Sequence, residues 1–169
     1  SELYNVFREE SGLYEDDEAP IPLKNILENG NVDERFFLRD EDMPKWIYAK
    51  GSKKERRHKK DGTEYYFNEG AVQFPEPLDK PSRTMLTSES SVGRSTHVVT
   101  DIKTGRLRTL TPRECERLNG FPDDWTNTGM PEKMRYFCMG NALVVPIAER
   151  IAKQIYEVLK DERPGKFYN

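Results

Sequence analysis

The clearest hydrophobic pattern lies near the C-terminus, where apolar side chains recur at spacings of three and four residues. The stripe consists of Ile147, Ile151, Ile155 and Val158. Charged and amide side chains occupy the positions between them. This period is typical of an amphipathic helix, and it predicts one over about 146–159.

A second helix is predicted by its start and stop signals. Thr111 fits an N-cap, Pro112 the first helical position, and Glu114 the residue that reaches back to the cap amide. Gly120 fits the C-terminal stop. The sequence therefore predicts a short helix that begins after Thr111 and ends before Gly120.

Alternating and β-branched residues predict two hairpins. The turn signal Asp61-Gly62 separates a basic run from the aromatic residues 65–67, which suits a first hairpin. In the second, a strand at 96–99 and the turn 103–106 lead into 107–110. Residues 83–87 are also predicted as a strand, followed by a polar loop at 88–95. Upstream, Asp40 is expected to cap a short helix that stops near Gly51.

Charge is distributed unevenly along the 169 residues. Residues 1–42 carry thirteen acidic against four basic residues, a net charge of −9, whereas residues 50–60 carry seven basic against one acidic, a net charge of +6. Such a basic run indicates either a polyanionic partner or a solvated loop. Hydrophobic residues make up only 35%, so we expect part of the chain to pack on something else.

The cysteines and histidines exclude several classes of protein. Two cysteines, Cys115 and Cys138, make no disulfide framework, and two histidines suggest no metal site. No apolar run approaches the roughly 20 residues of a membrane span, and residues 1–7 resemble no targeting peptide. The sequence predicts a protein of a soluble, reducing compartment, with no bound metal and no membrane partner.

Three stretches, in this order, match one family. They read PSRTMLT at 81–87, RTLTPRECERLNGFPD at 108–123 and MGNALVVP at 139–146. The second and third resemble motifs IX and X of DNA (cytosine-5) methyltransferases, and the first resembles the end of the target recognition domain that precedes motif IX. The resemblance covers residues 75–158, while residues 1–74 lie where that family varies.

The resemblance implies an α+β fold. A small β-rich target recognition domain with short helices would occupy residues 21–138, including the motif IX helix. Residues 139–160 would form motif X and a C-terminal amphipathic helix that belongs to an absent Rossmann-like methyltransferase domain. Residues 1–20 would be an acidic tail or linker and residues 161–169 a tail.

The resemblance also implies a reaction and its substrates. In the family, a cysteine thiolate attacks cytosine C6 and activates C5 toward the methyl group of S-adenosylmethionine. The target base is flipped out of double-stranded DNA, and neighbouring bases are read in the major groove. The implied DNA-binding residues are Arg83, Thr84, Ser88, Glu89, Ser90, Arg94, Ser95 and Thr96, together with Arg56 and Arg57 of the basic run. The implied cofactor-binding residues are Asn141, Ala142 and Leu143.

Particular roles can be assigned within that set. Arg94 suits a bidentate contact to guanine or a contact to phosphate, and Glu89 could accept from a cytosine amine. The basic run at 50–60 is expected to meet phosphates, which position without specifying sequence. A polar loop of this kind is otherwise simply solvated. Arg113 and Asp123 are predicted to be structural.

No catalytic residue of the family is visible in the chain. The family presents its nucleophile in a Pro-Cys motif, whereas Cys115 follows Glu114 and Cys138 follows Phe137. Both are therefore predicted to be core residues. The leading interpretation is an inactive fragment of a bacterial restriction-modification methyltransferase, located in the cytoplasm. The alternatives are a recognition subunit of a split enzyme and a non-enzymatic DNA-binding protein.

The missing N-terminal catalytic half is the expected partner of the last helix. Without it, the apolar stripe is expected to drive self-association or to fold back onto the recognition domain.

Overall fold

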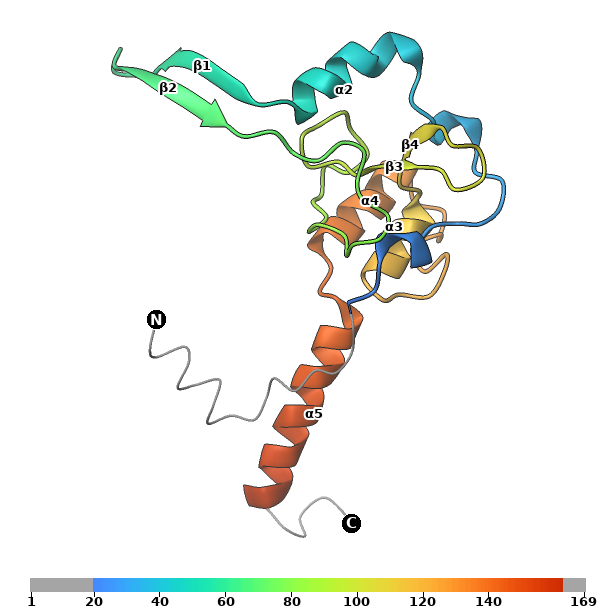
Figure 1. Ribbon diagram of the computed structural model, residues 1–169. Coiled ribbons are helices and arrows are strands. Elements are labelled where there is room, and N and C mark those ends of the chain that lie inside the picture. The colour runs from blue at the N-terminus through green and yellow to red at the C-terminus, as the bar shows by residue number, and fades with distance from the viewer. Residues whose placement is uncertain (1–19, 163–169) are drawn as a thin grey trace.

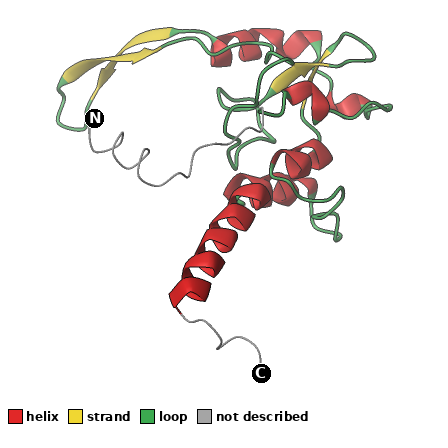
Figure 2. Cartoon of the chain, turned by 60° about the horizontal axis from the view of Figure 1, so that its bottom comes forward, coloured by secondary structure: helices red, strands yellow, loops and turns green. Residues whose placement is uncertain are grey.

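The computed structural model describes residues 20–162, which form a central body with two projections (Figure 1). One projection is the hairpin of β1 (Lys53–His58) and β2 (Glu64–Glu69), and the other is the last helix, α5 (Val145–Glu162). Figure 2 shows the same arrangement from a second direction. The predicted tails lie outside the described residues, apart from Pro20 and the last turn of α5.

The central body consists of short helices around one small sheet. Strands β3 (Val98–Thr100) and β4 (Leu107–Thr109) pair antiparallel, and Phe37 adds a single bridge to Arg108. The helices are the 3-10 turns Leu23–Asn25, Glu34–Phe36 and Asp40–Asp42, followed by α2 (Met43–Lys50), α3 (Pro112–Leu118) and α4 (Glu132–Asn141). The α+β class is as predicted, but the two sheets have only two strands each.

The first predicted hairpin is confirmed. Lys53 lies opposite Glu69 and His58 opposite Glu64, so the basic run forms the first arm. The turn places Gly62 at φ +84°, a left-handed conformation that glycine adopts without strain. Next to it, the Asp61 side chain accepts a 2.9 Å hydrogen bond from the amide of Thr63.

The helix predicted to begin at Asp40 starts later. Residues 40–42 form a 3-10 turn, and α2 begins at Met43 and ends next to Gly51, as expected for its C-terminus. The expected cap was wrong because no Asp side chain bonds the helix backbone here. The Asp42 carboxylate instead accepts from Arg39 and Lys45.

The capping box of α3 is confirmed. The Thr111 hydroxyl accepts from the amide of Glu114 at 3.2 Å, and the Glu114 carboxylate accepts from the amide of Thr111 at 2.8 Å. Beyond the helix, Gly120 adopts φ +78°. A side chain at Gly120 would also lie 2.7 Å from Pro146, so this glycine permits the close passage of the chain into α5.

Two parts of the prediction fail between these elements. Residues 83–87 are not a strand, because they have no ladder partner among the described residues. Helix α4 was not predicted from the sequence. Only Tyr136 and Met139 of this helix are buried, and two apolar positions are too few to establish a helical period. The two features are linked, because a Cβ on Gly140 would lie 2.3 Å from the amide nitrogen of Thr87. Close packing of α4 therefore takes the place of strand pairing.

The hydrophobic core is small and draws on the first two 3-10 turns, β3, α3, α4 and the segments between them. Its buried members are Leu23, Leu27, Phe36, Met85, Val99, Leu110, Cys115, Tyr136 and Met139. The hydroxyl of Tyr136 donates to the carbonyl of Leu110 at 2.7 Å, which satisfies a polar group inside the cluster.

A buried ionic cluster lies beside this core. Arg108 and Glu114 are fully buried and form a double hydrogen bond, with both nitrogen–oxygen distances at 2.7 Å. Asp101 accepts from Nε of Arg108 at 3.0 Å. Burial on its own lowers the pKa of Arg108, but the hydrogen bond to Glu114 and the two carboxylates leave that pKa raised. The guanidinium therefore stays charged inside the protein.

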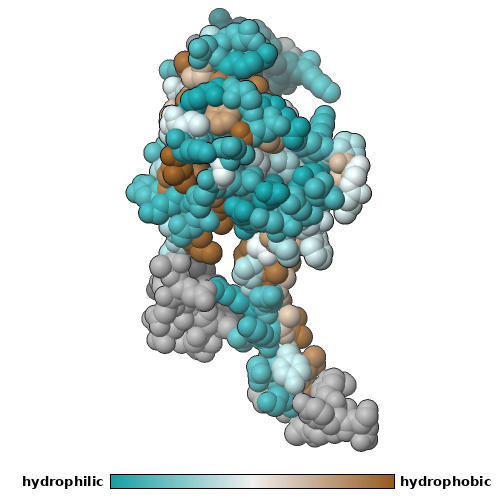
Figure 3. All heavy atoms as spheres, turned by 90° about the vertical axis from the view of Figure 1, so that its right-hand side faces the viewer, coloured by the Kyte–Doolittle hydropathy of each residue, from teal (hydrophilic) through white to brown (hydrophobic). Residues whose placement is uncertain are grey.

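Helix α5 leaves the body with its apolar stripe uncovered. Ile147, Ile151, Ile155 and Val158 are between 48% and 56% exposed, and Figure 3 shows hydrophobic atoms along one edge of the helix. The expectation that this helix folds back is wrong for the described residues, while self-association stays a prediction. Within residues 20–162, no helix combines the length and apolar character needed to cross a membrane.

Replacing Glu114 with Gln should strongly destabilise the central body. The substitution removes one of the two carboxylate charges that balance Arg108, and breaking a buried ion pair from one side costs roughly 3–5 kcal/mol. Urea unfolding followed by circular dichroism measures the loss in the free energy of unfolding.

The matched control is Glu34→Gln. It removes the same charge from an exposed pair with Arg106, where solvent screening leaves little to lose. Equal losses for the two variants would show that the buried cluster does not carry the stability assigned to it.

Candidate nucleic-acid interface

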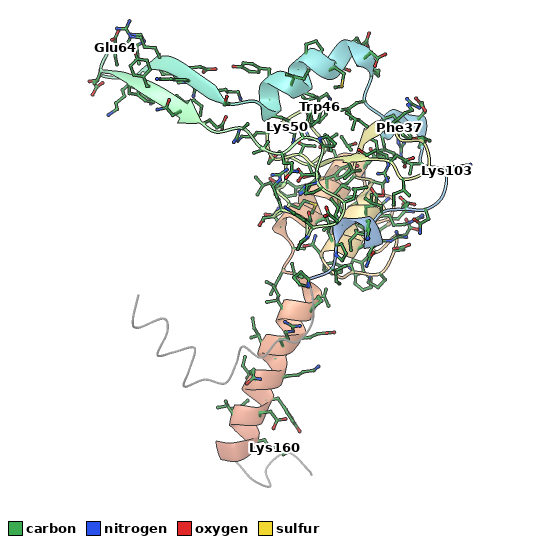
Figure 4. The ribbon with its side chains drawn as sticks, viewed as in Figure 1. Phe37, Trp46, Lys50, Glu64, Lys103 and Lys160 are labelled. Carbon is green, nitrogen blue, oxygen red and sulfur yellow. The ribbon has the colours of Figure 1, made fainter. Side chains whose placement is uncertain are left out.

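The polar loop predicted to read DNA, residues 88–96, lies between residues 83–87 and strand β3. It forms a series of turns and bends rather than a regular element. Lys50, at the end of α2, lies directly beside this part of the body (Figure 4). The partners of the loop decide which of its side chains remain open to a ligand.

Lys50 anchors the loop from the side of α2. Its side chain is only 2% exposed, and its amine donates to the carbonyl of Arg94 at 2.9 Å and also to the carbonyl of Thr96. Burial lowers the pKa of Lys50 to about 8, with a further lowering from the nearby charge of Arg83. Lys50 belongs to the basic run that was expected to meet phosphates, but in the structure this lysine is buried and binds backbone carbonyls.

Glu89 and His97 close the loop from within. One carboxylate oxygen of Glu89 accepts from the amide of His97 at 2.5 Å and lies 3.0 Å from its ring Nδ1. The other ring nitrogen, Nε2, lies 3.0 Å from the hydroxyl of Ser82. The hydroxyl of Thr96 donates to the carbonyl of Ser91 across the loop at 2.5 Å. These buried contacts hold both ends of the loop together.

The two arginines predicted to contact DNA are also engaged. Arg83 pairs with the buried carboxylate of Glu76. Arg94 pairs with Glu69 at 3.1 Å and donates to the carbonyl of Gly70, both at the base of the hairpin. Arg94 therefore fixes the hairpin to the loop.

The structure does not expose Glu89 for the base contact that was expected of it. Glu89 and Thr96 are buried, so neither side chain reaches a base edge. The groups left exposed in this region are Thr84, Leu86, Ser88, Ser90, Ser91 and Val92. Leu86 and Val92 were not among the candidate DNA-contacting residues expected from the sequence. Their apolar side chains within a polar stretch were the signal that could have identified them. Ser95 is half-buried, with its hydroxyl 3.4 Å from that of Ser88.

The hairpin separates the two arginines of the basic run. Arg56 shares one face of the ribbon with Tyr66 and is exposed. Arg57 lies on the other face, where it pairs with Glu55 and stacks over Phe67 at 3.8 Å from the ring centroid. The sequence grouped Arg56 and Arg57 together, and strand alternation places them on opposite sides.

The predicted cofactor residues lie at the end of α4 and directly after it. Asn141 is exposed, and its side-chain nitrogen donates to the carbonyl of Phe137 at 3.0 Å, while Leu143 is 60% exposed. An amide oxygen and an apolar side chain suit one edge of a nucleoside, but they do not enclose one. Ala142 instead borders a groove of about 460 Å³ that Arg83 and Thr84 also line. The structure thus brings one predicted cofactor residue next to two predicted DNA-contacting residues.

Arg113 and Asp123, which were predicted to be structural, take part in ion pairs within the body. Arg113 pairs with Glu28 at 2.9 Å and with Asp124 at 2.6 Å, and it lies 3.7 Å from Asp123. Glu28 also accepts from the hydroxyl of Thr111 at 2.6 Å. These contacts tie α3 to the segment after Leu27.

Both cysteines lie in the hydrophobic core or against it. Cys115 is fully buried in the core, and burial raises the pKa of its thiol well above the ordinary value. Cys138 is partly buried against the same core. Over residues 20–162, no cluster of three or more His, Cys, Asp or Glu side chains is positioned to hold a metal ion.

Comparison with curated proteins finds several type II methyltransferases that are similar to this chain. It is 55% identical over 141 residues to M.Sau3AI of Staphylococcus aureus, an alignment that covers 83% of this chain and 33% of that protein. It is 36% identical over 91 residues to M.MspI of a Moraxella species, covering 51% of this chain and 21% of that protein. The chain thus spans a third or less of these relatives.

Solved structures share the fold at low sequence identity. The Dnmt2 methyltransferase of S. pombe superposes with a TM-score of 0.60 at 16% identity, over 93% of this chain and 48% of that one. The Entamoeba histolytica methyltransferase EhMeth gives 0.57 at 18% identity, over 85% and 43%.

The family assignment rests on most of the sequence. The family model for C-5 cytosine-specific DNA methylases matches residues 10–157, a stretch that contains the hairpin, the 88–96 loop, α3 and α4. Because this match covers well over half of the chain, the protein belongs to the C-5 cytosine-specific DNA methylase family.

Proposed function

We propose that this chain is the part of a DNA (cytosine-5) methyltransferase that recognises the DNA target and completes the pocket for S-adenosylmethionine. Family membership supports the reaction class. The chain matches only 33% of the length of M.Sau3AI, which supports a division in which another part of the enzyme carries the catalytic cysteine. Since its relatives are bacterial type II methyltransferases, we place the enzyme in a bacterial modification system in the cytoplasm.

The single observation that carries the recognition role is the 88–96 loop. Its exposed side chains are mostly hydroxyls, and its backbone is held by Lys50, by the Glu89–His97 pair and by Arg94. A loop that is fixed before binding loses less conformational entropy when it binds. Hydroxyl groups on such a loop suit contacts to base edges and phosphates in a groove of the duplex.

The proposed roles of individual loop residues follow from their exposure. Ser88, Ser90 and Thr84 remain candidates for direct contact with DNA, and Val92 suits an apolar contact such as a thymine methyl group. Glu89 and Arg94 act instead as positioning residues. The proposed DNA-binding surface is therefore still the 88–96 loop, but the side chains proposed to contact DNA differ from those expected from the sequence.

The proposed domain division places residues 21–138 in the recognition domain and residues 139–160 with the catalytic domain. Its support is that α5 leaves the body with its apolar stripe exposed. Each of the four stripe residues is about half exposed, so covering it gains roughly half of the 1.5–3 kcal/mol of full burial. The catalytic part of the same enzyme is the partner that we assign to this stripe.

The motif X segment would supply one edge of the cofactor pocket. S-adenosylmethionine provides the methyl group when it is bound. Asn141 offers an amide oxygen and Leu143 an apolar surface at the end of α4. Because Gly140 packs on the backbone of Leu86 and Thr87, this edge is fixed relative to the segment that leads into the 88–96 loop.

The chain should select one short sequence from a pool of random duplex DNA. The measurement is sequencing of the DNA retained by the immobilised chain after several rounds of binding. Ser90→Ala should relax the preference at one base pair by about 1 kcal/mol, the net value of one hydrogen bond. Thr128→Ala, which removes an exposed hydroxyl from the turns between α3 and α4, should leave the selected sequence unchanged. Retained DNA with the composition of the input pool would refute the recognition role.

The chain by itself should transfer no methyl group. Its sequence holds two cysteines, neither preceded by proline, and burial keeps Cys115 protonated. Incubation with duplex DNA and radiolabelled S-adenosylmethionine should therefore leave the DNA unlabelled. Labelled 5-methylcytosine formed by the pure chain would overturn this division of labour.

Lys50 should make stability rise with pH in the alkaline range. Its pKa is about 8 in the folded chain against 10.5 for an ordinary lysine, so the unfolded state binds more protons between these values. The free energy of unfolding should therefore gain on the order of 3 kcal/mol relative to Lys50→Met from pH 8 to 10.5.

Urea unfolding of the two proteins at several pH values measures this gain. Cys115 and Tyr136, whose pKa values burial raises, contribute equally to both proteins and cancel in the difference. Parallel stability curves for Lys50→Met and the wild type would contradict the buried amine as the anchor of the loop.

A further inference from the structure

The β1–β2 hairpin reaches away from the body as a two-stranded ribbon (Figures 1 and 4). Contacts at its base hold it in place: Tyr48 donates to Glu55 at 2.8 Å, and Arg94 pairs with Glu69. Side chains along the ribbon alternate between two faces, and the pairing register assigns each residue to one of them. The two faces differ in net charge and in how many of their charged side chains are paired with each other.

One face, called here the inner face, is electrically balanced. Its members are Lys53, Glu55, Arg57, Tyr65, Phe67 and Glu69. Lys53 pairs with Glu69 at 3.4 Å and Arg57 with Glu55 at 2.8 Å. Two cations therefore meet two carboxylates, and this face presents no net charge to a partner.

The opposite face, called here the outer face, is exposed along its whole length. Its members are Lys54, Arg56, His58, Glu64, Tyr66 and Asn68. Arg56 and His58 share the carboxylate of Glu64, while Lys54 lies over the ring of Tyr66 at 5.9 Å. The tip adds Lys59 and Lys60. With two carboxylates, Asp61 and Glu64, against four permanent cations, all of the net positive charge of the ribbon lies on the outer face and the tip.

We propose that the outer face and the tip bind the phosphate backbone of duplex DNA that flanks the target sequence. The proposal rests on the recognition function proposed above and assigns a second DNA surface, separate from the 88–96 loop. Six residues per strand span about 20 Å, the length of roughly six base pairs at 3.4 Å each.

The chemistry of the outer face favours phosphates over base edges. Lysine carries a point charge without the planar fork that reads a guanine edge. Arg56, which has that fork, is already held by Glu64. Tyrosine and asparagine side chains add hydrogen bonds to phosphate oxygens. This surface therefore strengthens binding to every sequence and leaves the choice of sequence to the loop.

Two double variants with equal charge separate the faces. Lys54→Gln with Lys60→Gln removes two cations from the outer face and tip, and Lys53→Gln with Arg57→Gln removes two from the inner face. Each chain is titrated into fluorescein-labelled duplexes of about 30 base pairs, one rich in A·T and one rich in G·C, at several salt concentrations, and binding is followed by anisotropy. Circular dichroism confirms that the variants fold.

The outer variant should bind both duplexes roughly tenfold more weakly, with the slope of log affinity against log salt reduced by about 2, whereas the inner variant should keep the wild-type slope. Equal losses for both variants, or none for the outer one, would overturn the proposal and leave the recognition function standing. A loss confined to one duplex would show that the hairpin reads bases, which also overturns it. If the wild type binds neither duplex, the chain has no sequence-independent affinity for DNA and the proposal fails, whereas the recognition function is tested by the selection from random duplexes.

Discussion

The buried carboxylate of Glu114 is the point on which the central body depends. It accepts hydrogen bonds from the amides of Glu28 and Thr111, each at 2.8 Å, and from both terminal nitrogens of Arg108. These contacts fix the segment after Leu27, strand β4 and the start of α3 in one place. Since charged groups inside a protein are tolerated only when each is paired, a shifted arrangement of these segments would leave a charge without its partner.

The positions of the proposed functional segments follow from that cluster through a short series of contacts. At the end of α3, the carbonyl of Asn119 accepts the amide of Val145 at 2.8 Å, which sets where α5 begins. The Asn119 side chain donates to the carbonyl of Met139 and so holds the end of α4. Gly140 then meets the backbone of residues 86–87 without a side chain between them. The segment proposed to border the cofactor and the loop proposed to contact DNA are therefore parts of one rigid framework, as transfer between two bound molecules requires.

Whether a feature could be predicted from the sequence depends on how far apart in the chain its interacting residues lie. The capping box of α3, the turn at Asp61-Gly62 and the stripe of α5 rest on neighbouring residues, and each is present as predicted. The strand expected at 83–87 is absent. The backbone at the end of that segment packs against Gly140 of α4, a helix that the apolar period does not reveal. The base contact expected of Glu89 failed because its partner, His97, becomes a neighbour only in the folded loop. Local patterns located the candidate surface, and long-range contacts decided which side chains it presents.

The composition of the chain now has a physical explanation. With 35% hydrophobic residues, the body builds its interior partly from ionic groups, such as Arg108, Glu116 and Lys50, and it leaves the apolar stripe of α5 outside. A buried ionic group specifies one geometry but contributes little net free energy, because desolvation offsets its attraction. An exposed apolar stripe specifies its geometry less strictly, but its burial against any partner of matching shape is favourable in free energy. The chain thus combines a body ordered partly by buried ionic groups with a helix whose apolar stripe is uncovered. This is the combination expected of the recognition module proposed above, which would be completed by packing against a catalytic domain.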